Sequence, residues 1–399
     1  MRSDAIESRR LFVTAMLANV ALAGACAASG ANGDDPPAIV DAGGGAHRDG
    51  ASSPDASAPS DDAATTTDGG ATADAAADGP SQLPPMTMPA FIVGYNEAWF
   101  GAGFGTGLTT TFDRAYVDAT FDGIVRGGGH VVRIFLFELA QGIALGTTPP
   151  QTQGVSPAML ANVASVLESA RARGLWVYVT ALEGNAAYKY PPQQAYFKNL
   201  FNDTSGEGQA FQSNVLAPLL AVLDAHKDNV FGLDLVNEID APRSNGVWAD
   251  PTNGSRAFIQ RTASFVKSRS PWLRVTTTVG WGGAQYDVAN GYLSGLGLDF
   301  YDFHIYSDSG TYGGATAVCN RAAADGVPVY LGEFGQASHM IDDTLQYNAT
   351  ASFLNTAKSL CFKGALAWRY DTAENWWSYV RADGGYRPAV AIMQAFGGP

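Results

Sequence analysis

The sequence predicts an α/β protein folded as a (β/α)8 TIM barrel, in a single domain over residues 89–399 that follows a disordered linker. Three observations support this architecture. Apolar runs alternate with amphipathic helical patterns, which is the signature of a parallel sheet. The domain has the length of a barrel of ~250 residues with insertions. Two of the apolar runs end in glutamates, where barrels carry their functional groups.

Eight short apolar runs are expected to form the strands, because each is bounded by turn residues and is of the right length for a buried parallel strand. The predicted strands are Phe91–Tyr95, His130–Phe135, Leu175–Thr180, Phe231–Val236, Arg274–Val279, Asp299–His304, Val327–Leu331 and Ala365–Trp368.

Helices are expected between these strands. Residues 157–173 repeat apolar side chains on one helical face, after an N-cap at Ser156 and a proline in the first turn. Gly174 and Gly326 are placed to end helices before the next strand.

A six-stranded doubly wound sheet is the rival architecture, and it would place a Gly-rich phosphate loop directly after its first strand. The glycine-rich residues 101–105 are separated from the first strand by Asn96, Glu97 and Trp99, and no acidic ribose ligand ends the second strand. The barrel is therefore favoured.

The N-terminal residues predict export from a bacterial cell. Residues 1–25 have arginines followed by an apolar run, which is too short to span a membrane comfortably. The run ends at Cys26 and resembles a lipoprotein signal, in which this cysteine is lipidated and anchors the protein to the outer membrane. Cleavage after Ala25 by the ordinary signal peptidase, giving a secreted protein, is the alternative.

Residues 26–88 are rich in Ala, Asp, Gly, Pro, Ser and Thr and contain no aromatic residue, so they predict a disordered linker. Ten aspartates and one arginine in this stretch supply most of the formal net charge of −14. The acidity is therefore no evidence for a basic partner. No basic stripe suggests nucleic-acid binding, and no oligomer signal is present, so a monomer is expected.

Two cysteines, Cys319 and Cys361, fall late in predicted helices that would be neighbours on the outer ring. A disulfide between them and two separate buried thiols are both consistent with this placement. Neither has a histidine at metal-ligand or nucleophile-base spacing, so we expect no metal site and no cysteine enzyme. No cofactor is implied.

The ends of the strands carry carboxylates, amides and aromatic rings. Glu238 follows the fourth predicted strand and Glu333 follows the seventh. Because all strands of a barrel end on the same face, these two glutamates can meet across one cleft. Enzymes that hydrolyse a glycosidic bond need at least two carboxyl groups that face each other. The other polar or aromatic residues near strand ends are Tyr95, Asn96, Trp99, Arg133, Glu138, Glu183, Asn237, Trp281, His304, Tyr306 and Trp368.

Residues 90–399 resemble the clan of retaining glycosidases that includes glycoside hydrolase family 5. The motifs that carry the resemblance appear in the clan's order on the expected strands. They are Val-Val-Arg133-Ile-Phe, Asn237-Glu238, Phe-His304-Ile-Tyr306, Gly-Glu333-Phe-Gly and Ala-Trp368-Arg-Tyr.

The resemblance implies a role for each motif residue. Glu238 would be the acid/base and Glu333 the nucleophile, about 5 Å apart. Arg133 and Tyr306 would support the nucleophile, and Asn237 would bind the sugar 2-hydroxyl. His304 would orient the substrate or the acid/base, and Trp368 would lie beneath the attacked sugar.

Other residues leave alternatives open. Many family members carry a histidine after the third strand, and here Glu183, Asn185 or Tyr178 would fill that place. Asn96, Trp281 and Trp376 are further substrate-binding candidates, although both tryptophans suit core packing equally well. Glu138, Glu183 and Glu374 are interpreted as loop or rim residues rather than catalysts.

The leading hypothesis is an exported retaining β-glycoside hydrolase that acts within a β-1,4-linked polysaccharide. Mannan is favoured over glucan, because Phe91-Ile-Val-Gly-Tyr-Asn-Glu-Ala-Trp resembles the first strand of fungal-type endo-mannanases. The alternatives are an exo-acting β-glycosidase, a transglycosylase, and a surface-anchored, lectin-like pseudoenzyme that binds glycans without cutting them.

Overall fold

The computed structural model describes residues 84–101, 106–147, 151–280, 283–310, 312–338, 342–371 and 377–398. The expected export signal, Cys26 and the linker up to residue 83 lie outside the described residues. So do Trp281, Glu374 and Trp376.

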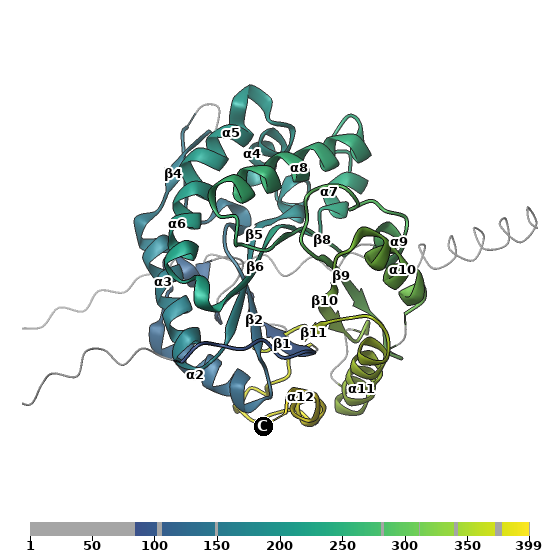
Figure 1. Cartoon of the computed structure of the whole chain (residues 1–399). Helices are drawn as coiled ribbons and strands as arrows, with labels where there is room; N and C mark the ends of the chain where they lie inside the picture. Colours follow the sequence, from purple (N-terminus) through teal and green to yellow (C-terminus); the bar gives the residue numbers. More distant parts are fainter. Residues whose placement is uncertain are drawn as a thin grey trace, which may run out of the picture. The chain divides into compact units, whose positions relative to one another are not determined.

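A parallel sheet of nine strands forms the centre of the described part, with helices around it (Figure 1). The order β7-β6-β5-β2-β1-β11-β10-β9-β8 is that of a (β/α)8 barrel opened between β7 and β8, which confirms the predicted fold. The strands are β1 Ile92–Asn96, β2 Val131–Phe135, β5 Trp176–Glu183, β6 Val230–Asn237, β7 Val275–Thr276, β8 Thr278–Val279, β9 Tyr301–Tyr306, β10 Val329–Gly335 and β11 Gly364–Ala367.

The fifth predicted strand is interrupted, so the expectation of one continuous strand over Arg274–Val279 is wrong. Thr277 separates β7, which pairs with β6, from β8, which pairs with β9. The hydroxyls of Thr276 and Thr277 donate to the backbone oxygens of Phe300 and Val236, at 2.7 and 3.0 Å. Such side-chain bonds compete with the strand ladder and explain the break.

A small antiparallel hairpin of β3 (Ile143–Leu145) and β4 (Thr152–Val155) lies between β2 and α3 (Pro157–Ala172) in the sequence. The sequence did not predict it, because strands of three and four residues are too short to show an alternating pattern.

The helices surround the sheet, and several of them begin at a residue whose side chain accepts a backbone hydrogen bond. Ser156 accepts from the backbone of Met159 at the start of α3, which confirms the predicted N-cap, and Gly326 ends α10 in the left-handed conformation. The helices are α2 Arg114–Arg126, α3 Pro157–Ala172, α4 Pro191–Asn202, α5 Glu207–Phe211, α6 Ala217–Ala225, α7 Asp240–Ser244, α8 Pro251–Arg269, α9 Ala284–Ala289, α10 Ala315–Asp325, α11 Asp343–Ser359 and α12 Ala389–Gly397. The short 3-10 or π-helical segments are η1 Thr106–Leu108, η2 Glu138–Ala140, η3 Gly184–Ala187, η4 Thr204–Gly206, η5 Gln212–Leu216 and η6 Lys227–Asn229.

The amino-terminal end of the barrel is closed by aromatic rings. Tyr178, Phe231, Phe300 and Tyr330 are buried together, and the Arg274 guanidinium lies 4.7 Å from the Phe300 ring centroid. This cluster fills the barrel near the starts of the strands. Functional groups are therefore free to gather at the opposite end.

A disulfide joins Cys319 of α10 to Cys361, which follows α11. The bond decides between the two alternatives that the sequence left open, and it links neighbouring parts of the outer ring.

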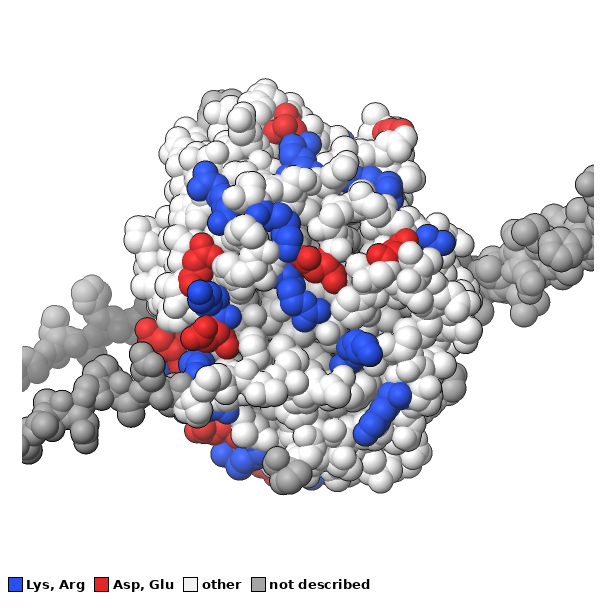
Figure 2. Space-filling view, in the orientation of Figure 1, with Lys and Arg blue, Asp and Glu red and all other residues white. Residues whose placement is uncertain are grey.

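On the face shown in Figure 2, basic and acidic side chains are interspersed among uncharged ones. Among the described residues, no helix has both the length and the apolar character that crossing a bilayer requires.

Candidate active site

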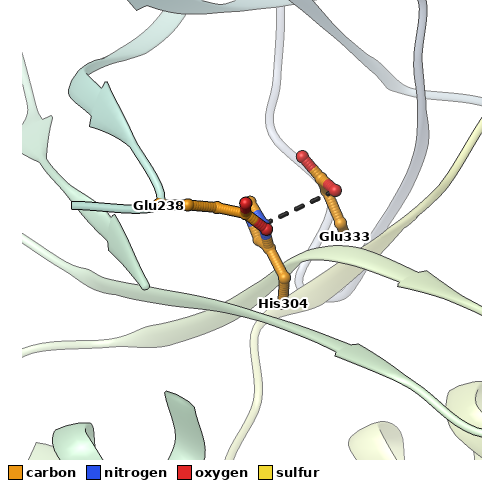
Figure 3. A group of neighbouring side chains, drawn as sticks. All are labelled: Glu238, His304 and Glu333. Atoms are coloured by element: carbon orange, nitrogen blue, oxygen red, sulfur yellow. Dashed lines mark hydrogen bonds and ion pairs between the residues drawn. The ribbon is translucent and has the colours of Figure 1, made fainter. Parts of the chain in front are cut away.

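The two glutamates singled out in the sequence lie together at the carboxyl ends of their strands. Glu238 is the first residue after β6, and Glu333 lies near the end of β10. One carboxyl oxygen of each and a ring nitrogen of His304 all lie within 4.8 Å of one another. Figure 3 shows the three side chains converging from three different strand ends.

The backbone turns sharply at Glu238. Its φ of 52° lies in the left-handed region that residues with a side chain rarely adopt. The Glu238 N–H donates to the hydroxyl of Thr278 at 2.9 Å, which holds this conformation. A Cβ on Gly280 would lie 2.0 Å from Glu238 Oε1, so the glycine leaves the space that the carboxyl group occupies.

Both oxygens of Glu333 accept hydrogen bonds. Arg133 donates to Oε1 at 2.5 Å, and the Tyr306 hydroxyl donates to Oε2 at 2.6 Å. The residue is 4 % exposed. A cation on one oxygen and a hydroxyl on the other hold the carboxyl group in one orientation.

Arg133 is fully buried and links Glu333 to three further side chains. It donates to Asp234 at 2.8 Å, to Asn237 at 2.9 Å and to Asn96 at 3.2 Å. Burial disfavours its charge, but the carboxylates of Glu333 and Asp234 outweigh burial and raise the pKa of Arg133. The guanidinium is therefore a permanent positive charge under the site.

Asn96 is also fully buried, and its amide donates to the backbone oxygens of Gly332 and Ala367, at 2.9 and 3.3 Å. The structure thus places this expected substrate-binding residue beneath the site, where it supports Arg133.

His304 is neutral in this environment, because burial lowers its pKa to about 3. Its Nδ1 lies 3.1 Å from Glu238 Oε1 and 3.5 Å from Glu333 Oε2. A neutral imidazole can donate to an ionised Glu238 or accept from a protonated one. His304 can therefore orient the Glu238 carboxyl group in either protonation state.

Glu138 and Glu183 are buried, so the expectation that they are rim residues is wrong. Their side chains are 2 % and 5 % exposed. Glu138 accepts from the Trp99 indole at 2.5 Å, and Glu183 accepts from the Asn237 amide at 2.8 Å. Sequence reasoning placed both at strand ends but had no signal for how the following loops fold over them.

Aromatic rings line one side of the site. Trp368, the first residue after β11, lies edge-on to Trp99 and Phe135, with ring centroids 5.8 and 6.0 Å away. Trp377 lies 5.8 Å from the Tyr306 ring and donates to the Gln336 backbone at 3.0 Å. Trp99 and Trp377 thus extend the aromatic surface beyond the predicted Trp368, and sugar rings stack on surfaces of this kind.

A metal ion could also be bound by Glu238, His304 and Glu333, because their oxygen and nitrogen atoms lie close enough together. Arg133 and Tyr306 already bond both oxygens of Glu333, however. Coordination would bring a second cation beside the buried guanidinium. The two hydrogen bonds on Glu333 therefore count against its use as a metal ligand.

Comparisons with known proteins agree with this architecture. No protein-family model matches the sequence, and no curated protein does. Many solved structures match the fold. One is the endo-1,4-β-mannanase from Eisenia fetida, with a TM-score of 0.58 and 20 % identity over 78 % of this chain and 91 % of that one.

Two other solved structures match this chain with similar TM-scores and sequence identities. The β-1,4-D-mannanase from Cryptopygus antarcticus has a TM-score of 0.59 at 17 % identity, over 78 % of this chain and 91 % of that one. The exo-β-1,4-mannosidase from Opitutaceae bacterium strain TAV5 has a TM-score of 0.58 at 17 % identity, over 77 % of this chain and 59 % of that one. At these identities the likeness establishes the barrel fold.

Proposed function

We propose that this protein is a retaining β-glycoside hydrolase, with Glu333 as nucleophile and Glu238 as acid/base. The observation that carries the proposal is the approach of the two carboxyl groups to within 4.8 Å at the carboxyl ends of β6 and β10. Retaining enzymes hold this pair about 5 to 5.5 Å apart, whereas inverting enzymes leave room for a water molecule, at about 6.5 to 9.5 Å.

In the first step, a carboxylate oxygen of Glu333 attacks the anomeric carbon. The bond from that carbon to the leaving oxygen breaks, and the proton of Glu238 passes to that oxygen. Arg133 and Tyr306 hold the Glu333 carboxyl group in place for the attack and bind the ester that forms.

In the second step, Glu238 is ionised and takes a proton from a water molecule, whose oxygen attacks the anomeric carbon. The ester bond to Glu333 breaks, and Glu238 is again protonated. Two displacements restore the original anomeric configuration. Asn237 supplies an N–H for the sugar 2-hydroxyl, a contact that strengthens in the transition state.

Replacing the nucleophile tests the assignment. Glu333→Ala should abolish turnover, and azide should partly restore it by entering the vacated space and giving an α-glycosyl azide, identified by NMR. Glu168, which is exposed on α3, provides the matched control, and Glu168→Ala should keep full activity. Full activity in Glu333→Ala would refute the proposal.

We further propose a β-1,4-linked polysaccharide as substrate, with mannan favoured, glucan as the close alternative and internal cleavage over exo action. The first-strand resemblance and the fold likeness to two β-mannanases support mannan, while one similar structure is an exo-mannosidase. Reducing-end assays on β-mannans and β-glucans, with chromatography of the products, test this choice. Oligosaccharides of mixed length indicate internal cleavage, single sugars indicate exo action, and binding without release favours a lectin-like protein.

We also propose that the protein is exported and held at a bacterial membrane surface by a lipid on Cys26. The support is the leader pattern of residues 1–25 and the solvated composition of the linker behind it.

A further inference from the structure

Glu183 ends β5 directly beside the proposed catalytic residues. The register of the parallel pair β5 and β6 sets Glu183 opposite Asn237. A Cβ on the next residue, Gly184, would lie 2.6 Å from the Glu238 backbone oxygen and 2.7 Å from that of Asn237. The glycine therefore permits the close approach that brings a third carboxyl group to the site.

The Glu183 carboxyl group contacts both sides of this junction. Its Oε2 accepts from Asn237 Nδ2 at 2.8 Å, and its Oε1 accepts from the backbone and side-chain nitrogens of Asn185, at 2.8 and 2.5 Å. Asn185 Nδ2 in turn lies 3.5 Å from Glu238 Oε2. Glu183 is therefore connected directly to Asn237 and through Asn185 to Glu238.

These contacts fix which way the Asn237 amide faces. Its oxygen accepts from Arg133 at 2.9 Å, while its nitrogen donates to Glu183. A flipped amide would set its N–H groups against the guanidinium and its oxygen against a carboxylate. Of the two amide N–H groups, one is used by Glu183, and the second is left for a substrate hydroxyl.

We infer that Glu183 is a positioning residue of the proposed glycosidase: it orients the Asn237 amide for the sugar 2-hydroxyl. This inference rests on the proposed function and adds to it a residue in the place where related enzymes carry a histidine.

The charges around Glu183 support this role. The groups that face it are Glu138 on η2, Tyr188 after η3 and Glu238 after β6, with Arg133 reached through Asn237. Burial raises the pKa of Glu138 and that of Tyr188. Burial and the Glu238 carboxylate raise the pKa of Glu183 to about 8. With or without a proton, Glu183 keeps an oxygen that accepts from the Asn237 amide.

The kinetics of Glu183→Gln test the inference. At the optimum, kcat should fall about tenfold, because Gln has one oxygen and cannot accept from both Asn185 and Asn237.

Two further measurements separate this role from a structural one. Thermal unfolding and the matched exposed variant Glu168→Gln control for folding, and both proteins should melt near the wild type. On a 2-deoxy aryl glycoside, which lacks the hydroxyl that Asn237 binds, the kcat deficit of Glu183→Gln should shrink.

The outcomes are distinct for the two proposals. An inactive wild type refutes the glycosidase itself. If the wild type is active, the role of Glu183 is overturned by a folded Glu183→Gln that keeps full kcat, or by a kcat deficit that is the same on the 2-deoxy substrate.

Discussion

At the scale of single residues, the site depends on one buried cation shared among several acceptors. Arg133 faces the carboxylates of Asp234 and Glu333 and the amide oxygens of Asn96 and Asn237. Two carboxyl groups thus share one guanidinium. Carboxyl groups this close together raise the cost of ionising others nearby, which suits Glu238 as the proposed acid/base.

Gly280 gives a prediction about the position of the acid/base. The Cβ in Gly280→Ala would overlap Glu238 Oε1 and push the carboxyl group out of place, without requiring a disallowed backbone conformation. We expect kcat/KM to fall about 100-fold, since a displacement near 1 Å costs that much, while the melting temperature changes little.

The control is Gly154→Ala, because a Cβ at Gly154 meets nothing within 4 Å. It should keep wild-type kcat/KM in the same assay. Wild-type activity in Gly280→Ala would contradict the placement of Glu238 described above.

The sequence was informative about which residues gather and less so about their contacts. Glu238, Glu333 and His304 were placed by strand order alone, because a barrel brings all strand ends to one face. The sequence could not show that Asn96 lies under Arg133, or that Glu183 reaches Asn237. Such contacts depend on side-chain rotamers and strand register, which leave no periodic pattern.

At the scale of elements, regular strands were predictable and irregular ones were not. Seven predicted strands rest on apolar runs that the sheet buries on both faces, and they match observed strands within a few residues. The fifth breaks at Thr277 because the hydroxyls of Thr276 and Thr277 replace ladder bonds. The break has a function, since Thr278 beyond it accepts the N–H that holds Glu238 in its left-handed turn.

The disulfide gives a prediction at this scale. Cys319 on α10 and Cys361 after α11 enclose β10, the strand that carries Glu333. Removing the link in Cys319→Ser/Cys361→Ser should lower the free energy of unfolding by about 2 to 4 kcal/mol, because the unfolded chain regains the entropy of an open loop.

Urea unfolding measures this loss, and the wild type treated with a reductant should approach the double variant. The kcat should stay unchanged at temperatures where both proteins are folded, since neither cysteine touches the site. Equal stability with and without the bond would refute the prediction.

At the scale of the whole molecule, the two ends of the barrel have different tasks. Aromatic rings and Arg274 close the end where the strands start, and the proposed catalytic groups occupy the other end. The described chain begins at the closed end, where the Pro84 backbone oxygen accepts from Arg171 at 2.5 Å and Pro85 and Met86 lie near Trp176 and Trp272.

This arrangement gives a prediction for the proposed lipid anchor. In a bacterial host, the full chain should incorporate labelled palmitate and sediment with membranes. A chain whose residues 1–26 are replaced by an ordinarily cleaved export signal should be released in soluble form. Because residues 84–86 lie at the closed end of the barrel, away from Glu238 and Glu333, both proteins should have the same kcat/KM on a soluble oligosaccharide. An unlabelled, soluble full chain would instead indicate cleavage after Ala25, and a lower kcat/KM in the released protein would show that the tether contributes to the site.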